Sequence, residues 1–509
     1  MVATLNTISF EGVCVQDIEV QVQLAPGLPA FTLVGLPDKA VSESRERVRS
    51  AIHAMGLSLP AKKMVVNLSP ADITKEGSHF DLPIALTLLM AMGVIPEDAL
   101  QNTVAMGELA LDGRIRPTAG TLPAAIHANS SAKRFICSEA NGPEAAISGH
   151  DEIWAAPSLL ALLNHIKGKQ MLQQPEPMPL GKEAKPAVDM RDIKGQPVAR
   201  RGLEIAAAGA HNLLLSGPPG AGKSMLAAAL PGILPPLTSS EMLEHSMVAS
   251  IAGTIEKKGV ERRRPYRSPH HSCSMAAMVG GGKRVMPGEI SLAHHGVLFL
   301  DELPEFQTPV LESLRQPLET GEVSIARASA HVTFPSRFQF VAAMNPCRCG
   351  FIADAARACS KAPKCGEDYR AKISGPLLDR MDITIEVQDV PTLDMLDSAE
   401  GEASEVIAAR VAAARNRQIE RYKSEGLSIR TNAELSGEQI IKSVALDTKA
   451  RELMERATNQ MQLSMRGYHR VLKVARTIAD LENSDAVLHQ HVAEAISYRQ
   501  MHYARQKAA

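Results

Sequence analysis

The spacing of hydrophobic and polar positions changes along this 509-residue chain and predicts alternating strands and helices at first. Residues 19–24 alternate strictly, as a half-buried strand does, and residues 63–68 form a second strand candidate. Residues 42–55 carry their apolar side chains at helical spacing, and Gly113 is typical of a hairpin turn. We therefore expect a mixed α+β domain over residues 1–170.

A proline- and charge-rich stretch at residues 173–186 breaks this pattern, and we assign residues 171–188 to a linker. A second α/β domain with a parallel sheet is expected over residues 189–391. Helical spacing then dominates, for example at 450–461 and 469–481, so residues 392–509 are predicted to form a helical domain.

The second domain contains a complete phosphate-binding loop between a predicted strand, 212–216, and a predicted helix, 225–230. Glycines let successive backbone N–H groups face phosphate oxygens, and the helix N-terminus adds a positive dipole. We expect the lysine to contact the β- and γ-phosphates of ATP and the serine to bind Mg²⁺. The loop consists of Gly217, Pro218, Pro219, Gly220, Ala221, Gly222, Lys223 and Ser224.

Polar residues end two further apolar runs of this domain. The run 297–300 is followed by Asp301 and Glu302, and the run 338–344 by Asn345. Open α/β sheets bind ligands at the carboxyl ends of their strands, so Asp301 is expected to hold Mg²⁺ and Glu302 to accept a proton from the attacking water. Asn345 would orient that water; the alternative is a turn asparagine before Pro346.

Composition adds few constraints. The net charge of −1 gives no overall basic field, so any nucleic-acid contact must come from local patches. We find no signal peptide and no apolar stretch long enough to span a membrane. Seven scattered cysteines indicate a reducing compartment, and we expect a cytoplasmic protein.

Four of those cysteines, Cys347, Cys349, Cys359 and Cys365, follow the second apolar run closely. Four thiolates so near in sequence could complete a tetrahedral structural zinc site, although the spacing is not that of a standard zinc ribbon. Reduced loop thiols are the alternative. The histidine pairs at 270–271 and 294–295 are not expected to share a metal, because adjacent residues of a strand or helix point different ways.

Together with the motif Ser-Gly-Pro-Leu-Leu-Asp-Arg-Met-Asp at 374–382, these features resemble the AAA+ ATPases. The blocks 34–38, 65–72, 267–271, 286–306 and 472–480 narrow the resemblance to the YifB/ComM family of magnesium-chelatase-like proteins, over nearly the whole chain. The resemblance implies an active ring, usually a hexamer. It also implies that Arg380 is an arginine finger acting on a neighbouring subunit.

The same resemblance assigns further residues. Arg466, with Arg470 as a second candidate, matches the lid arginine that senses the γ-phosphate. Ile193 and Gln196 belong to a segment that packs against adenine. Two loop insertions would face the pore of the ring, one near residues 271–286 and one at 321–334. Their basic residues, Lys283, Arg284 and Arg327, are candidates for DNA phosphate contacts, with incidental surface charge as the alternative.

The first domain resembles the proteolytic domain of Lon proteases without its catalytic dyad. Asp81 stands about where the nucleophilic serine should be, and Ser78 lacks the expected surrounding motif. A Thr-Leu-Pro segment beginning at Thr121 replaces the expected lysine. A nucleophile without its activating base does no chemistry, so we expect a binding or assembly module.

The resemblance implies an ATP-dependent DNA motor, a helicase and branch-migration factor that acts in the integration of DNA during natural transformation. Its expected partners are single-stranded or branched DNA and further copies of the chain. One alternative is a chelatase-like ATPase that drives metal insertion into a tetrapyrrole. An ATP-dependent protease is the other, and the missing dyad speaks against it.

Overall fold

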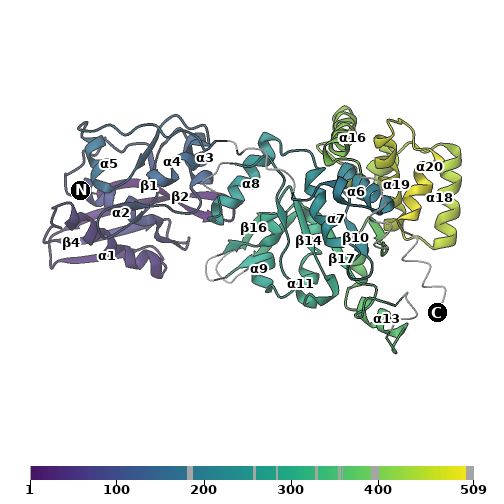
Figure 1. Ribbon diagram of the computed structural model, residues 1–509. Coiled ribbons are helices and arrows are strands. Elements are labelled where there is room, and N and C mark those ends of the chain that lie inside the picture. Colours follow the sequence, from purple (N-terminus) through teal and green to yellow (C-terminus); the bar gives the residue numbers. More distant parts are fainter. Residues whose placement is uncertain are drawn as a thin grey trace.

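The computed structural model describes residues 2–179, 181, 187–255, 260–282, 285–326, 331–352, 357, 359–390 and 401–499. Three parts follow one another along the molecule (Figure 1): a mixed α/β part, a central part around a parallel sheet, and a helical part at the C-terminal end. The predicted fold class, with its parallel sheet and C-terminal helical region, is confirmed.

The N-terminal part is built on a seven-stranded mixed sheet. The predicted strands at 19–24 and 63–68 lie inside β2 and β4, which pair antiparallel. Helix α2 (Asp81–Ala91) is buried along most of its length and packs on β1 and β2. In sheet order the strands are β3 (Ala30–Val34), β4 (Lys63–Ser69), β2 (Cys14–Ala25), β1 (Val2–Glu11), β5 (Thr103–Ala105), β8 (Arg134–Ser138) and β9 (Ile153–Ala156).

Helices and one small hairpin complete this part. The predicted helix at 42–55 is α1 (Lys39–Ala54). Its N-cap is Asp38, whose carboxylate accepts a hydrogen bond from the Val41 N–H at 2.7 Å. The Gly113 turn joins β6 (Glu108–Leu109) and β7 (Ile115–Arg116), as predicted. The remaining helices are α3 (Thr121–Ser130), α4 (Gly142–Ala146) and α5 (Leu159–Ile166).

The central sheet has five strands, and every neighbouring pair is parallel. The strand before the phosphate loop, β10, lies between β17 and β18, so its carboxyl end meets theirs at one edge of the sheet. In sheet order the strands are β11 (Tyr266–Arg267), β14 (Val297–Leu300), β17 (Gln339–Met344), β10 (Leu213–Ser216) and β18 (Ile383–Glu386).

Nine described helices surround this sheet or connect its strands. They are α6 (Pro197–Gly209), α7 (Lys223–Ala229), α8 (Ser239–Ile251), α9 (Met275–Val279), α10 (Glu289–Leu292), α11 (Thr308–Ser313), α12 (Pro317–Thr320), α13 (Lys364–Arg370) and α14 (Gly375–Leu378).

Two antiparallel hairpins stand where the loop insertions were expected. The strands β15 (Glu322–Ala326) and β16 (His331–Pro335) form one, and β12 (Gly280–Gly281) with β13 (Met286–Pro287) forms the other. The hairpins touch, because a Cβ atom placed on Gly280 would lie 3.1 Å from Ile325 Cδ1. The candidate DNA contacts Lys283, Arg284 and Arg327 lie outside the described residues.

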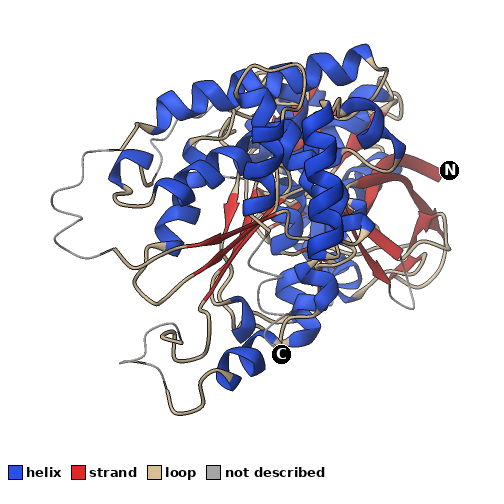
Figure 2. Ribbon diagram, turned by 90° about the vertical axis from the view of Figure 1, so that its right-hand side faces the viewer, coloured by secondary structure: helices blue, strands red, loops and turns tan. Residues whose placement is uncertain are grey.

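The C-terminal helices share one apolar core with the central sheet. Helix α19 supplies much of it and packs against α6 and α20. Figure 2, which looks from this end of the molecule, shows these helices in front of the strands. The helices are α16 (Ser404–Ser424), α17 (Glu438–Ser443), α18 (Thr448–Met461), α19 (Met465–Leu481) and α20 (His489–Ser497).

The N-terminal part docks on the central part through α8 and the β15–β16 hairpin. The backbone N–H of Gly120 donates to the Ser250 carbonyl at 2.9 Å, and the Leu122 N–H donates to Ser250 Oγ at 3.2 Å. An apolar cluster lies beside these bonds and contains residues of both parts: Phe10, Val13, Ile251, Ile325, Val332 and Phe334.

Among the helices that the structure describes, none is long and apolar enough to cross a bilayer.

Candidate nucleotide site

The phosphate-binding loop occupies the carboxyl end of β10 and leads directly into α7, which begins at Lys223. Gly220 and Gly222 have φ values of 83° and 86°, the left-handed region that favours glycine. A Cβ atom on Gly217 would lie 2.2 Å from the Val387 carbonyl oxygen of the segment after β18. These glycines therefore permit both the turn and its close packing on the neighbouring strand.

The ammonium group of Lys223 is held inside this loop. It donates to the carbonyls of Gly217 and Pro218 at 2.9 and 2.8 Å and to Asn345 Oδ1 at 3.0 Å. Burial lowers the pKa of Lys223. These three oxygen atoms hold the Lys223 side chain over the loop. A bound nucleotide phosphate would replace them as the acceptor of the ammonium N–H groups.

Ser224 and Asp301 meet across the site although they are far apart in sequence. The Ser224 hydroxyl donates to Asp301 Oδ2 at 2.6 Å. Mg²⁺ prefers such hard oxygen ligands, and it is usually held by one or two protein oxygens together with phosphates. The pair therefore fits an ATP-bound Mg²⁺ ion.

Glu302 follows Asp301 at the end of β14 and adopts a left-handed backbone, with φ at 50°. Its N–H donates to Asp301 Oδ1 at 2.9 Å, and its side chain is 53% exposed. The carboxylate lies 3.5 Å from Nδ1 of His271. A carboxylate reachable by solvent beside the Mg²⁺ ligands suits a general base.

His271 was missed as a site residue in the sequence. It lies in the block Arg-Ser-Pro-His-His at 267–271, four residues after the end of β11, whose neighbour β14 carries Glu302. No local sequence signal marks it, because the contact depends on β11 and β14 being neighbours that end at the same edge of the sheet.

Asn345 reaches the site because β17 lies between β10 and β14. It directly follows β17, and its amide oxygen accepts the bond from Lys223. Lys223, Ser224, Asp301, Glu302 and Asn345 thus meet at one sheet edge. The sequence predicted each of these residues separately, and the strand order explains why they converge.

Ile193 and Gln196 lie on the β18 side of the phosphate loop. Gln196 donates through Nε2 to the Gln388 carbonyl at 2.7 Å, and Ile193 is 5% exposed in the apolar core. The segment after β18 joins them to the loop, since the Val387 N–H donates to the Ser216 carbonyl at 2.8 Å. This place is compatible with the predicted adenine contact.

Arg380 does not belong to this cluster in the single chain. Its carbonyl accepts a hydrogen bond at 3.0 Å from the side chain of Asn212, which precedes β10, so it lies at the amino end of the strands. Its guanidinium donates to Glu319 Oε2 at 2.5 Å and to the Pro376 carbonyl at 2.9 Å. The phosphate loop is at the opposite end of β10.

Arg466 likewise forms no contact with the phosphate loop among the described residues. It is exposed in the first turn of α19. Arg470, one turn later, lies 3.4 Å from Asp382, and the backbone N–H of Asn212 donates to the same carboxylate at 3.0 Å. Arg380 and Arg470 therefore share one end of the sheet.

The comparison with protein families agrees with this site. Residues 189–395 match the family described as "Magnesium chelatase, subunit ChlI", residues 20–141 "Subunit ChlI of Mg-chelatase", and residues 401–499 "Magnesium chelatase, subunit ChlI C-terminal". A YifB protein of Salmonella typhimurium is 42% identical, over 98% of this chain and 97% of its own length. The competence protein ComM of Haemophilus influenzae is 43% identical, over 96% of both chains.

The chain belongs to the YifB/ComM family of magnesium-chelatase-like AAA+ ATPases. Membership implies ATP and Mg²⁺ as ligands, which the phosphate loop and the Ser224–Asp301 pair fit. A more distant relative is the magnesium-chelatase 38 kDa subunit of Rhodobacter capsulatus, 23% identical over 62% of this chain and 88% of its own length. More than a third of the present chain, a YifB/ComM family member, is therefore not aligned with the chelatase subunit.

In this family member His294 and His295 approach the same carboxylate, which corrects the expectation that their side chains point different ways. The rings of His294 and His295 lie 3.9 Å apart, and both approach Glu244, with His295 Nε2 at 2.7 Å. They face one another because His295 has a left-handed φ of 59°. His294 Nδ1 accepts the Arg337 N–H at 3.0 Å, so its proton is on Nε2, toward Glu244. Hydrogen bonds thus account for the cluster.

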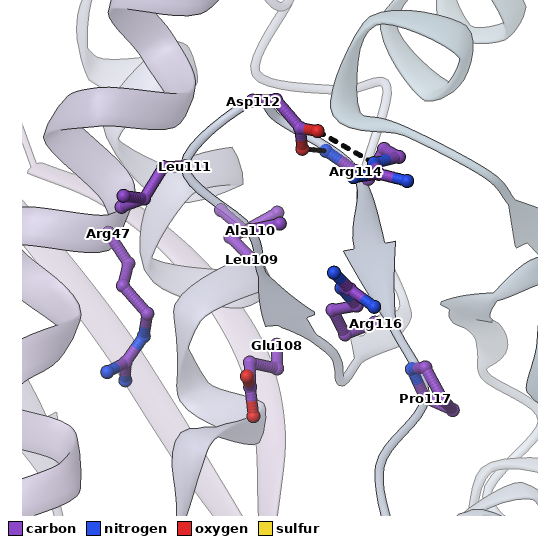
Figure 3. A pocket seen from close by; sticks show the side chains of 9 residues that line it. All are labelled: Arg47, Glu108, Leu109, Ala110, Leu111, Asp112, Arg114, Arg116 and Pro117. Carbon is purple, nitrogen blue, oxygen red and sulfur yellow. Dashed lines mark hydrogen bonds and ion pairs between the residues drawn. The ribbon is translucent and has the colours of Figure 1, made fainter.

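The N-terminal part contains an open pocket of about 680 Å³, lined in part by Arg47, Glu108, Arg114 and Arg116 (Figure 3). Asp81, which is buried, forms an ion pair with the lining residue Arg47 at 2.5 Å. The Ser78 hydroxyl donates to Glu108, and the buried Lys75 donates to the Pro70 carbonyl. The serine and the lysine thus have separate partners, and the described residues of this region show no Ser–Lys dyad.

Proposed function

We propose that this protein is an ATP-driven DNA motor that assembles into a ring, with helicase and branch-migration activity. The observation that carries the proposal is the position of Arg380, at the opposite end of β10 from the phosphate loop of its own chain. A ring, which we propose to be a homohexamer, would place this guanidinium on the γ-phosphate bound by the next subunit, where it would neutralise transition-state charge.

Hydrolysis follows from the residues at the sheet edge. Backbone N–H groups of the loop and Lys223 would bind the phosphates, and Ser224 with Asp301 would hold Mg²⁺, which neutralises phosphate charge when bound. Glu302 would take the proton of the attacking water, and Asn345 would orient that water. Arg466, or Arg470, would sense the γ-phosphate. Ile193 and Gln196 would contact adenine.

The two touching hairpins support a DNA-binding role. In the sequence, Lys283, Arg284 and Arg327 fall between the paired strands of these hairpins. A few cations per subunit, repeated around a ring, suffice for contacts to the phosphate backbone. We propose that the hairpins line the pore of the ring and bind single-stranded or branched DNA. We also propose that the protein is cytoplasmic.

The relative named as a competence protein supports a role in integrating incoming DNA during natural transformation. The test is an assay of strand displacement and branch migration on forked and four-way substrates, with ATP and with a non-hydrolysable analogue. DNA-stimulated hydrolysis and ATP-dependent movement of the branch support the proposal. An assembled ring that neither binds nor moves branched DNA would refute it.

A chelatase-like remodelling function is the second candidate, because all three matching families carry the name of a magnesium-chelatase subunit. Metal insertion into a tetrapyrrole, measured with chelatase partner subunits present, would support it. Proteolysis is the weaker alternative, and ATP-dependent degradation of casein would support it.

A further inference from the structure

The four cysteines between β17 and α13 come together in the structure. Cys347 Sγ lies 3.1 Å from Cys349 Sγ, and Cys359 Sγ lies 3.4 Å from Cys365 Sγ. The sulfur atoms of Cys347, Cys349 and Cys365 are all within 4.8 Å of one another, and the Cys359 side chain also interacts with that of Cys349. Three of the sulfur atoms thus form one cluster, and Cys359 joins it through its contacts with Cys349 and Cys365.

We propose that these four thiolates bind one structural Zn²⁺ ion. A tetrahedral site with Zn–S bonds of about 2.3 Å requires sulfur atoms about 3.8 Å apart. The separations within the two pairs, 3.1 and 3.4 Å, and the separations below 4.8 Å among Cys347, Cys349 and Cys365 are close to this value. A closed set of four protein ligands is typical of structural rather than catalytic zinc.

The surrounding backbone is arranged around the sulfurs. The N–H groups of Phe351 and Cys359 donate to the Cys349 side chain, the kind of second-shell bond that orients a thiolate ligand. Gly350 has a φ of 85°, and its N–H donates to the Cys347 carbonyl at 3.0 Å, which closes a tight turn between the first two ligands. The sequence Cys-Arg-Cys-Gly is thus folded for metal binding.

Gly366 in α13 allows the close packing that places Cys365 near Cys347. A Cβ atom on Gly366 would lie 2.7 Å from Ile352 and 3.2 Å from the Pro346 carbonyl, so α13 packs closely on this turn. Its neighbour Cys365 then faces Cys347, which is fully buried. Outside α13 the described part of this segment is turns and loops, and a metal supplies the cross-link that such a small unit lacks.

The zinc site would stabilise the connection between two parts of the nucleotide site. Asn345 stands two residues before Cys347, and a Cβ atom on Gly350 would lie 2.3 Å from Pro219 of the phosphate loop. On the other side, α13 leads to the segment that carries Arg380, with Lys372 anchored 3.6 Å from Glu305. An effect of the metal on hydrolysis rests on the proposed function, whereas metal binding itself does not.

The test is the metal content of the full-length protein, purified without chelators and measured by mass spectrometry. We expect one zinc per chain, lost in Cys347→Ser and Cys365→Ser and kept in the matched control Cys14→Ser, whose thiol is exposed and outside the cluster. Because a cluster variant can fail to fold, a second measurement uses wild-type protein: replacement of the metal by Co²⁺ should give the absorption spectrum of a tetrahedral tetrathiolate.

The proposal is overturned if the wild-type protein contains no stoichiometric zinc, whether its four thiols titrate as free or as disulfides. Stoichiometric iron in place of zinc would refute the assignment of the ion. Zinc retained in folded Cys347→Ser and Cys365→Ser would refute the assignment of the ligands. None of these outcomes depends on ATP or DNA, so they are independent of any failure of the motor function.

Discussion

At the residue scale, the sequence predicted most of the nucleotide-binding chemistry. Strand, glycine loop and helix stand in one contiguous stretch, so the roles of Lys223 and Ser224 need only local pattern. The contact between His271 and Glu302 could not be predicted in this way, because it depends on which strands pair. The left-handed φ that turns His295 toward His294 is likewise a product of tertiary packing.

Two substitutions separate binding from hydrolysis. Lys223→Ala should abolish ATP binding, since it removes a buried cation from the phosphate loop. Glu302→Gln should bind ATP normally but hydrolyse it at least about 100-fold more slowly, because the amide cannot accept the proton. Fluorescent-nucleotide binding and phosphate release measure the two effects, with exposed Lys169→Ala as control. Unchanged hydrolysis in Glu302→Gln would assign the base elsewhere.

His271 is expected to position Glu302. His271→Ala should lower kcat about tenfold while ATP affinity stays the same, because the carboxylate loses its neighbour. The adjacent His270→Ala is the matched control, since the His270 ring packs on His271 but forms its hydrogen bond with Ser272 rather than with Glu302. Equal kcat values for the two variants would remove His271 from the site.

At the element scale, the strands and helices with clear periodicity were predictable, including the hairpin at β15–β16. The order of the five strands was not, because it is fixed by long-range pairing. That order decides the site: β17 inserts Asn345 between the phosphate loop and the carboxylates. The closeness of the four cysteines depends in the same way on the packing of α13 against Pro346.

The lid helix α19 and the sheet meet at Asp382, which precedes β18. Burial acts to raise its pKa, but the neighbouring His211, whose Nδ1 lies 3.6 Å from Oδ2, together with Arg470 and Lys473, lowers it to about 2. A carboxyl group with a folded pKa below its ordinary 3.8 stabilises the fold above about pH 4, and this stabilisation is lost as the pH falls toward 2.

Asp382→Asn should therefore lower the free energy of unfolding at pH 7 by about 2 kcal/mol. The difference from wild type should shrink between pH 4 and pH 2. Denaturant unfolding across this pH range measures it, with exposed Asp389→Asn as control. A difference that stays constant down to pH 2 would show that the ionised carboxylate is not the source.

At the scale of the whole molecule, the N-terminal part rests on the hairpin proposed to contact DNA. A Cβ atom on Gly12 would lie 2.3 Å from the Thr333 carbonyl oxygen of β16. Gly12→Val should therefore weaken docking and speed protease cleavage near the 171–188 linker. Gly56→Val is the matched control, because Gly56 also has a positive φ but has open space around its Cβ position. Equal cleavage rates in the two variants would mean that docking does not depend on this contact.

The central claim is that each ATP site is completed by Arg380 of a neighbouring subunit. The most direct measurement mixes two inactive variants, Lys223→Ala and Arg380→Ala, and follows DNA-stimulated ATP hydrolysis. The first variant supplies an intact arginine, and the second supplies an intact phosphate loop. We predict that each is inactive alone and that the mixture regains hydrolysis. Mixed rings that form but remain inactive at every ratio would contradict the shared site.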